Sequence, residues 1–317
     1  MESLRSFVEA LEAFADRLAA VDPTLLGIAL ALSLANLVLR SRAWRNILRA
    51  AHPGARIPAR TAFGAYVAGV GVNAVVPARA GDLVKVFLVH RRVEGTSYPT
   101  LVATLLCETL VDMLLAGSLV LYALEAGLLP GIPRLPRIPA FDLSWGADNP
   151  WALLAIAGAV LAVALYLAGR VKAFWRKFGQ GLAILRTPRR YLRLVVPYQL
   201  VGWACRLAAA YFFLEAFHVP GSLQAAILVQ VAGSVARLFP ATPGGLGPIQ
   251  ALLVVMLAGT APRADVLAFS VGMEMSLLVF NVLLAVVAIA LMSGGGLRLR
   301  SVMADARAAR AKDASGV

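Results

Sequence analysis

Five apolar runs in this chain are long enough to cross a lipid bilayer as helices. A helix needs about 20 mostly apolar residues to span the hydrocarbon core of a membrane. Hydrophobic residues make up 60% of the 317 positions, which is more than a soluble core of this size can bury. The sequence therefore predicts an all-α polytopic membrane protein, with spans at about 24–40, 100–129, 151–169, 194–218 and 265–292.

The cations of the chain gather beside these runs. The net charge is +13, and three segments are strongly basic: Arg40–Arg60, Arg170–Arg193 and the tail after Met292. Basic segments next to membrane spans stay in the cytoplasm. We therefore attribute the positive charge to topology and expect no nucleic-acid partner. We expect a multi-pass protein of the bacterial inner membrane with a cytoplasmic C-terminus and an N-terminus outside.

Two further apolar segments are broken in the middle. Thr61–Val76 meets the polar stretch PARAGD before Leu83–Val89, and Leu223–Phe239 meets PATPGGLGP before Ile249–Ala258. A helical piece as short as Leu83–Val89 is about 12 Å long and cannot cross a membrane alone. If all three basic segments lie on one side, each broken segment must add an even number of crossings. We therefore predict two re-entrant helical hairpins, at 61–90 and 223–259.

The order helix, hairpin, helix occurs twice, in units that the crossing count places in opposite orientations. The hairpin tips share Pro, Ala, Gly and Leu at matching offsets in PARAGDL (77–83) and PATPGGL (240–246). Inverted repeats with paired broken helices are a transporter architecture. The predicted organisation is an amphipathic interfacial helix at 1–22, a first repeat at 23–130, a connecting region at 131–193 that contains the span 151–169, a second repeat at 194–292 and a basic tail at 293–317.

The tips carry residue types that suit an anion. Glycine allows close backbone approach, and each second half-helix would begin inside the membrane with free amides at its positive dipole end. We predict that an anionic headgroup binds there, to Arg79, Gly81, Lys85, Arg206, Arg237, Gly244, Gly245 and Gly247. The alternative is that these cations only neutralise acids, for example Asp82 with Lys85 or Arg79.

Acids at membrane depth form the second candidate group. Ionisable residues are costly there, so a functional role is a fair expectation. The spacing of Glu108 and Asp112 puts both on one helix face, opposite Arg79 or Arg206 in an ion pair, or in a coupling role. The predicted coupling or ion-pair residues are Asp82, Glu108, Asp112 and Glu274.

Two separated motifs carry a resemblance to a known family. The first tip matches the pattern N-x-x-x-P-x-R-x-G-E-x-x-R at Asn73, Pro77, Arg79 and Gly81, with Asp82 and Lys85 as conservative replacements. A later E-R-x-x-D element fits Glu108 and Asp112, with Thr109 in place of its arginine. The second tip matches P-x-P-G-G-x-G-x-x-E at Pro243, Gly244, Gly245 and Gly247, with Gln250 where an acid is usual.

In these motifs the chain resembles the lysylphosphatidylglycerol synthase transmembrane family, a flippase-like, UPF0104-type group of integral membrane proteins. The resemblance implies a lipid transporter that moves an anionic phospholipid or lipid-linked headgroup between leaflets by alternating access, with membrane lipids as its partners. A secondary transporter of a small anion, or a non-transporting scaffold for membrane-lipid synthesis, remains open. Each of these functions allows a homo-oligomer or a lipid-synthesis enzyme as partner.

We do not expect an enzyme. The only histidines are His52, His90 and His218, and no His/Cys cluster has the spacing of metal ligands. The sequence accordingly predicts no catalytic residue, no metal and no cofactor.

Overall fold

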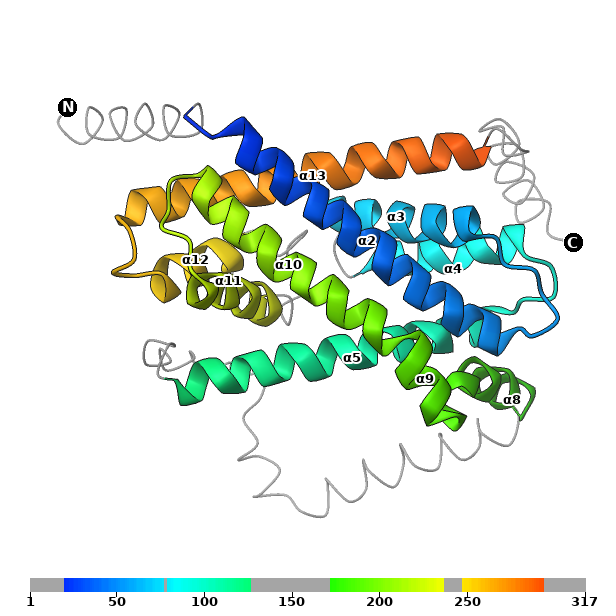
Figure 1. The fold of residues 1–317 in the computed structure, drawn as a ribbon. Coiled ribbons are helices and arrows are strands. Elements are labelled where there is room, and N and C mark those ends of the chain that lie inside the picture. The colour runs from blue at the N-terminus through cyan, green and yellow to red at the C-terminus, as the bar shows by residue number, and fades with distance from the viewer. Residues whose placement is uncertain (1–19, 77–78, 127–171, 237–246, 294–317) are drawn as a thin grey trace, which may run out of the picture.

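The computed structural model describes residues 20–76, 79–126, 172–236 and 247–293 (Figure 1). Every regular element in these ranges is a helix. The elements are α2 (Pro23–Ala51), α3 (Ala59–Val75), α4 (Ala80–Arg92), α5 (Tyr98–Glu125), α8 (Lys172–Gly181), the 3₁₀ helix η2 (Ala183–Arg186), α9 (Pro188–Leu194), α10 (Val196–Ala216), α11 (Leu223–Ala236), α12 (Pro248–Met256) and α13 (Arg263–Ser293).

Three predicted features lie wholly or almost wholly outside the described residues. They are the interfacial helix at 1–22, the connecting span at 151–169 and the basic tail at 293–317. These three remain predictions.

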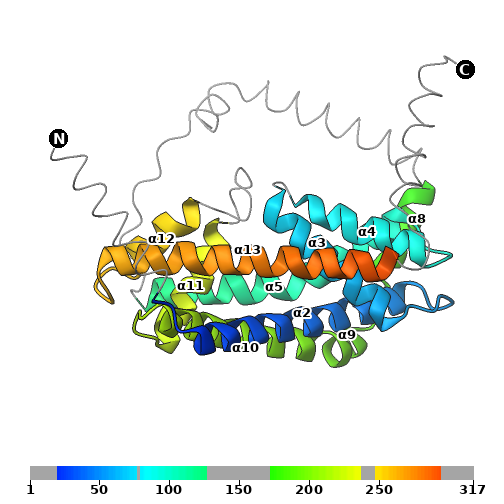
Figure 2. The ribbon, with the colours of Figure 1, turned by 90° about the horizontal axis from the view of Figure 1, so that it is seen from above.

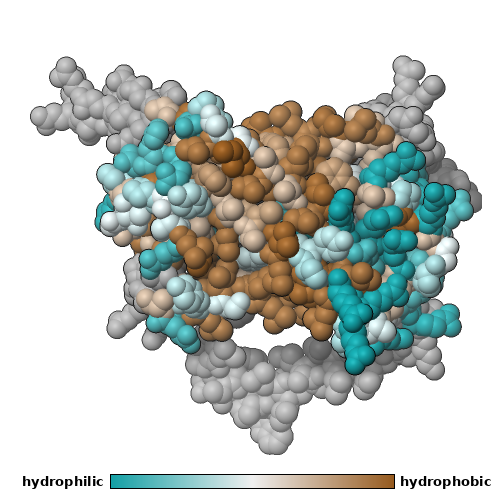
Figure 3. All heavy atoms as spheres, viewed as in Figure 1, coloured by the Kyte–Doolittle hydropathy of each residue, from teal (hydrophilic) through white to brown (hydrophobic). Residues whose placement is uncertain are grey.

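Three of the described helices, α2, α5 and α13, are long and apolar enough to cross a membrane. The outward faces of α5 and α13 carry large apolar side chains, since Met113 is 71% exposed, Leu114 66% and Leu291 79%. A band of hydrophobic surface crosses the middle of the molecule, with hydrophilic surface on both sides of it (Figure 3). An apolar belt of this kind marks a surface that faces lipid. The predicted class, an all-helical polytopic membrane protein, is confirmed.

Helix α2 runs well past its predicted end. Its start follows local rules, because the Asp22 carboxylate accepts hydrogen bonds from the amides of Thr24 (2.8 Å) and Leu25 (3.1 Å). The helix then continues from Arg40, where the sequence predicted its end, to Ala51. Its buried side chains keep helical spacing through this extension, at Ala43, Trp44, Ile47 and Leu48. Half of the first basic segment is therefore packed helix.

The first broken segment forms two short helices, α3 and α4, packed against each other. A Cβ atom on Gly81 would collide with the carbonyl oxygen of Gly69, so only glycine allows the two backbones to come so close. With 17 and 13 residues, the two helices are about 25 Å and 20 Å long. Both are shorter than the hydrocarbon core of about 30 Å.

The second broken segment repeats this arrangement. Helices α11 and α12 pack against each other, and the residues between them, 237–246, lie outside the described ranges. With 14 and 9 residues, they are about 21 Å and 13 Å long. Neither is long enough to span the bilayer alone.

The long helices bring the two halves of the chain together. Helix α2 packs along α10, α3 packs on α13, and α11 packs on α5. Seen from above, the α3–α4 pair lies along one half of the molecule and the α11–α12 pair along the other (Figure 2). Of the polar residues that the sequence singled out, Glu108 and Asp112 on α5 and Arg206 on α10 make contacts between these helices.

Candidate functional site

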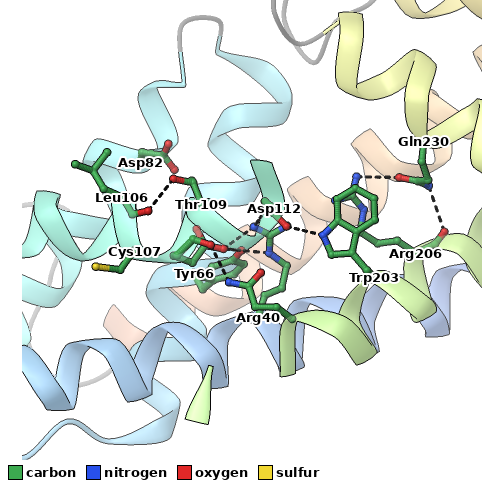
Figure 4. Close-up of polar contacts among 12 residues, drawn as sticks. Arg40, Tyr66, Asp82, Leu106, Cys107, Thr109, Asp112, Trp203, Arg206 and Gln230 are labelled. Atoms are coloured by element: carbon green, nitrogen blue, oxygen red, sulfur yellow. Dashed lines mark hydrogen bonds and ion pairs between the residues drawn. The ribbon is translucent and has the colours of Figure 1, made fainter. Parts of the chain in front are cut away.

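A cluster of charged side chains surrounds Arg40 on α2. Its Nη2 atom lies 2.5 Å from Oε1 of Glu108 and also contacts Oδ2 of Asp112, and its Nε donates to Glu108 Oε1 at 3.1 Å. The two acids lie one helical turn apart on α5, so they share a face. One guanidinium therefore bridges two carboxylates, as Figure 4 shows for Arg40 and Asp112.

This partner differs from the one that the sequence predicts. The sequence predicts a cytoplasmic segment at Arg40 and places Arg79 or Arg206 opposite the acids. Arg40 lies inside the bundle because α2 continues beyond it. A signal was available, since Arg40 is four residues after Asn36 and four before the buried Trp44, which puts all three on one helix face.

Glu108 is the most buried member of the cluster. It is 2% exposed, and its Oε1 also accepts a hydrogen bond from the Tyr66 hydroxyl at 3.0 Å. The Gln199 side chain donates to the Glu108 backbone carbonyl at 2.7 Å. A buried carboxylate is tolerated when it is paired and hydrogen-bonded in this way. No feature of the sequence indicates that Tyr66, within an apolar run, takes part.

Asp112 continues the polar contacts toward the second half of the chain. Trp203 on α10 donates its indole N–H to Asp112 Oδ1 at 2.8 Å, and the Arg206 guanidinium lies 4.4 Å from the centre of the Trp203 ring. Arg206 also donates to Gln230 Oε1 on α11 at 2.9 Å, and the Gln230 amide donates back to the Arg206 carbonyl at 3.3 Å. Figure 4 shows this route from Asp112 to Gln230.

Lys85 on α4 joins the same cluster through Tyr66. Its Nζ lies 3.1 Å from Asp82 Oδ1, one turn away on the same helix, and 4.3 Å from the centre of the Tyr66 ring. Only 5% of Lys85 is exposed. Of the two partners that the sequence offered Asp82, the structure gives Lys85.

Arg79 stands apart from this cluster. It is exposed and directly precedes α4, with φ 57° and ψ 31°, the left-handed conformation. For a residue other than glycine this conformation costs about 1–2 kcal/mol. The amide of Gly81, which the sequence analysis expected to be free, donates to the Asn73 side chain at 2.7 Å.

The second tip is described only at its edge. Arg237, Gly244 and Gly245 lie outside the described residues. Gly247 has φ 91°, and its amide donates to the Gln250 side chain at 2.6 Å. Glu274 lies on α13 and is half-buried.

The described contacts of the central cluster join three acids and three cations. The acids are Asp82, Glu108 and Asp112, and the cations are Arg40, Lys85 and Arg206. The cluster can therefore hold helices of both halves together. Among the described residues, no group of three or more His, Cys, Asp or Glu side chains could hold a metal ion.

Comparisons with known proteins agree with the resemblance at the two tips. A family model described as the lysylphosphatidylglycerol synthase TM region matches residues 6–302. Glycosyltransferase AglD of Haloferax volcanii is 26% identical over 280 residues, which cover 76% of this chain and 44% of that protein. The UPF0104 membrane protein MJ1078 of Methanocaldococcus jannaschii is 22% identical over 189 residues, which cover 59% of this chain and 78% of that protein.

Proposed function

Since the chain belongs to the lysylphosphatidylglycerol synthase transmembrane family, we propose that it moves an anionic phospholipid or lipid-linked headgroup between the leaflets of a membrane. The headgroup binds at the hairpin tips while the acyl chains remain in the bilayer. Membership in this family also supports a broader conclusion, that the chain is a membrane protein concerned with lipids or lipid-linked glycans.

The observation that carries this proposal is the contrast between Arg79 and the central cluster. Arg40 and Lys85 form ion pairs with acids. Arg79, in contrast, is exposed and forms no ion pair within the described residues. It also holds a strained backbone conformation, a feature that is often retained for function. A phosphate at the first tip would meet this side chain first.

The packing supports a site between two inverted re-entrant hairpins. Each hairpin pairs helices too short to cross alone, and the two halves repeat the same contacts. Between the halves, α3 packs on α13 as α11 packs on α5; within them, α4 packs on α5 as α12 packs on α13. In this proposal the two repeats rock against each other and open the tips to alternate sides.

The orientation follows from charge. The ends of α2, α4 and α9 carry exposed arginines, among them Arg49, Arg91 and Arg193. We place this end in the cytoplasm, the N-terminus outside and the protein in a bacterial inner membrane.

Two other functions compete with this proposal. A soluble anion would use the same tips, and a scaffold for lipid synthesis would need no transport. We propose no catalytic role, because the chain spans 44% of the length of the relative named a glycosyltransferase, and that activity is not carried over.

The test is native mass spectrometry of the whole protein in gentle detergent. The wild type and an Arg60→Gln control, exposed at the start of α3, should retain an anionic lipid that Arg79→Gln loses. Equal retention in all three would remove Arg79 from the site. A rise in melting temperature with inorganic phosphate alone, and no retained lipid, would favour the soluble anion.

A further inference from the structure

The second basic segment of the chain is folded onto the bundle. Helices α8 and α9 and the turn η2 between them lie against the ends of α2 and α5. We call residues 176–194 the basic platform. Positive charge alone can orient a membrane protein without fixed geometry. A segment that serves only topology would not need the contacts described next.

Its first half is held by two hydrogen bonds and a close approach. The Thr100 hydroxyl on α5 donates to the Lys177 carbonyl at 2.8 Å, and the Gln180 amide donates to the Ala51 carbonyl at 3.0 Å. A Cβ on Gly181 would collide with the Thr100 carbonyl oxygen, so α8 rests directly on α5.

Two hydrogen bonds also hold the second half of the platform against α2 and α5. The Asn46 side chain donates to the Leu194 carbonyl at 2.7 Å, and the Tyr191 hydroxyl donates to the Cys107 carbonyl at 2.8 Å. Burial, followed by the nearby Cys107 and acidic groups, raises the pKa of Tyr191 to about 12. Tyr191 therefore keeps its proton, and this hydrogen bond, throughout the physiological pH range.

The outer face of the platform is strongly cationic. Its exposed cations are Arg176, Lys177, Arg186, Arg189, Arg190 and Arg193. The sequence has no acid from residue 172 to residue 214. Within the part of the chain that the structure describes, none of these six side chains forms an ion pair.

Apolar side chains lie among these arginines on α9. Leu192 is 58% exposed and Leu194 37%, in the sequence PRRYLRL. Helix α9 leads directly into α10, which packs along the membrane-spanning α2. The platform thus lies where a bundle meets the membrane surface. Exposed leucines between arginines are typical of segments that lie in the headgroup layer.

We propose that the basic platform binds the anionic phospholipid headgroups of the leaflet that it faces. The six cations would attract the phosphates, and Leu192 and Leu194 would enter the acyl boundary. A soluble acidic protein would explain the charge but not the exposed leucines. The inference goes beyond the proposed function, because a platform of this kind would bind lipid in a protein that transports nothing.

The test uses the whole protein in phosphatidylcholine vesicles with spin-labelled phosphatidylglycerol or spin-labelled phosphatidylcholine. Electron paramagnetic resonance gives the preference of the protein surface for one lipid over the other. The platform variant is Arg190→Gln/Arg193→Gln. The matched control, Arg56→Gln/Arg60→Gln, removes two exposed arginines of the connection from α2 to α3.

Attraction to an anionic surface is worth about a fivefold change in affinity for each nearby cation. The wild type and the control should therefore prefer phosphatidylglycerol, and the platform variant should lose that preference several-fold at an unchanged melting temperature. Salt should weaken the preference of the wild type. Equal loss in both variants, or loss in neither, would overturn the proposal. A wild type without any preference would overturn it too and favour the acidic protein.

Discussion

At Arg40 a single guanidinium pairs with two acids inside a membrane protein. Leaving a buried charge unpaired costs about 3–5 kcal/mol, whereas removing all members of a buried ion-pair group can be nearly neutral. The contribution of Arg40 therefore depends on whether Glu108 and Asp112 are present.

We expect Arg40→Met to lower the stability by about 3–5 kcal/mol, because it leaves Glu108 and Asp112 unpaired. The triple variant with Glu108→Gln and Asp112→Asn should recover most of this loss. Arg42→Met, at an exposed position on the same helix, should change stability by less than about 0.5 kcal/mol. Chemical unfolding in detergent measures all three. A triple variant no more stable than Arg40→Met would contradict the assignment.

The buried side chain of His52, at the end of α2, makes the stability of the fold depend on pH. It is 5% exposed, its Nδ1 donates to the Leu48 carbonyl at 3.2 Å, and its buried Nε2 has no hydrogen-bond partner among the described residues. Burial lowers the pKa of His52 below its ordinary value of 6.5, and the hydrogen bond to Leu48 opposes this only in part. The folded protein therefore favours the neutral ring.

Below about pH 6.5 the unfolded chain binds a proton that the folded protein resists, so acid should destabilise the fold. We expect the melting temperature to fall from pH 7 to about pH 5. His52→Asn, which can keep a donor toward Leu48, should reduce this fall. An identical pH dependence in both proteins would show that His52 does not contribute.

At the scale of the element, the first hairpin depends on the contact between Gly69 and Gly81. Gly81→Ala would force the backbones of α3 and α4 apart, since its Cβ would meet the Gly69 carbonyl oxygen. We expect a loss of about 1–3 kcal/mol, as for other overpacked sites. Gly117→Ala is the control, because no atom of the described residues lies within 4 Å of a Cβ there and alanine favours a helix. Equal effects on thermal unfolding would argue against the tight crossing.

The elements themselves were largely predictable. Apolar runs located α2, α5, α10 and α13, and the Pro- and Gly-rich breaks fall between α3 and α4 and between α11 and α12. The end of α2 was missed because charge was read as the end of a span, although the apolar spacing around Trp44 continues through the arginines. The platform was also missed, since a basic segment without long apolar runs gives no sign that it folds.

At the scale of the whole molecule, the candidate site was predictable only in part. The acids Glu108 and Asp112 stood out because charge is rare in an apolar run. Their partner did not, because tertiary packing decides which of several arginines faces them. Tyr66 and Trp203 gave no signal, since aromatic residues are ordinary in spans and only the fold turns their polar atoms toward the acids.

The most direct test of the account is headgroup movement in sealed vesicles that contain the pure protein and tail-labelled phosphatidylglycerol. An impermeant quencher reports how much label reaches the outer leaflet. We predict that the wild type transfers phosphatidylglycerol faster than phosphatidylcholine, that Arg60→Gln behaves the same, and that Arg79→Gly is inactive although it relieves the left-handed backbone. Full activity in Arg79→Gly, or equal transfer in vesicles without protein, would contradict the account.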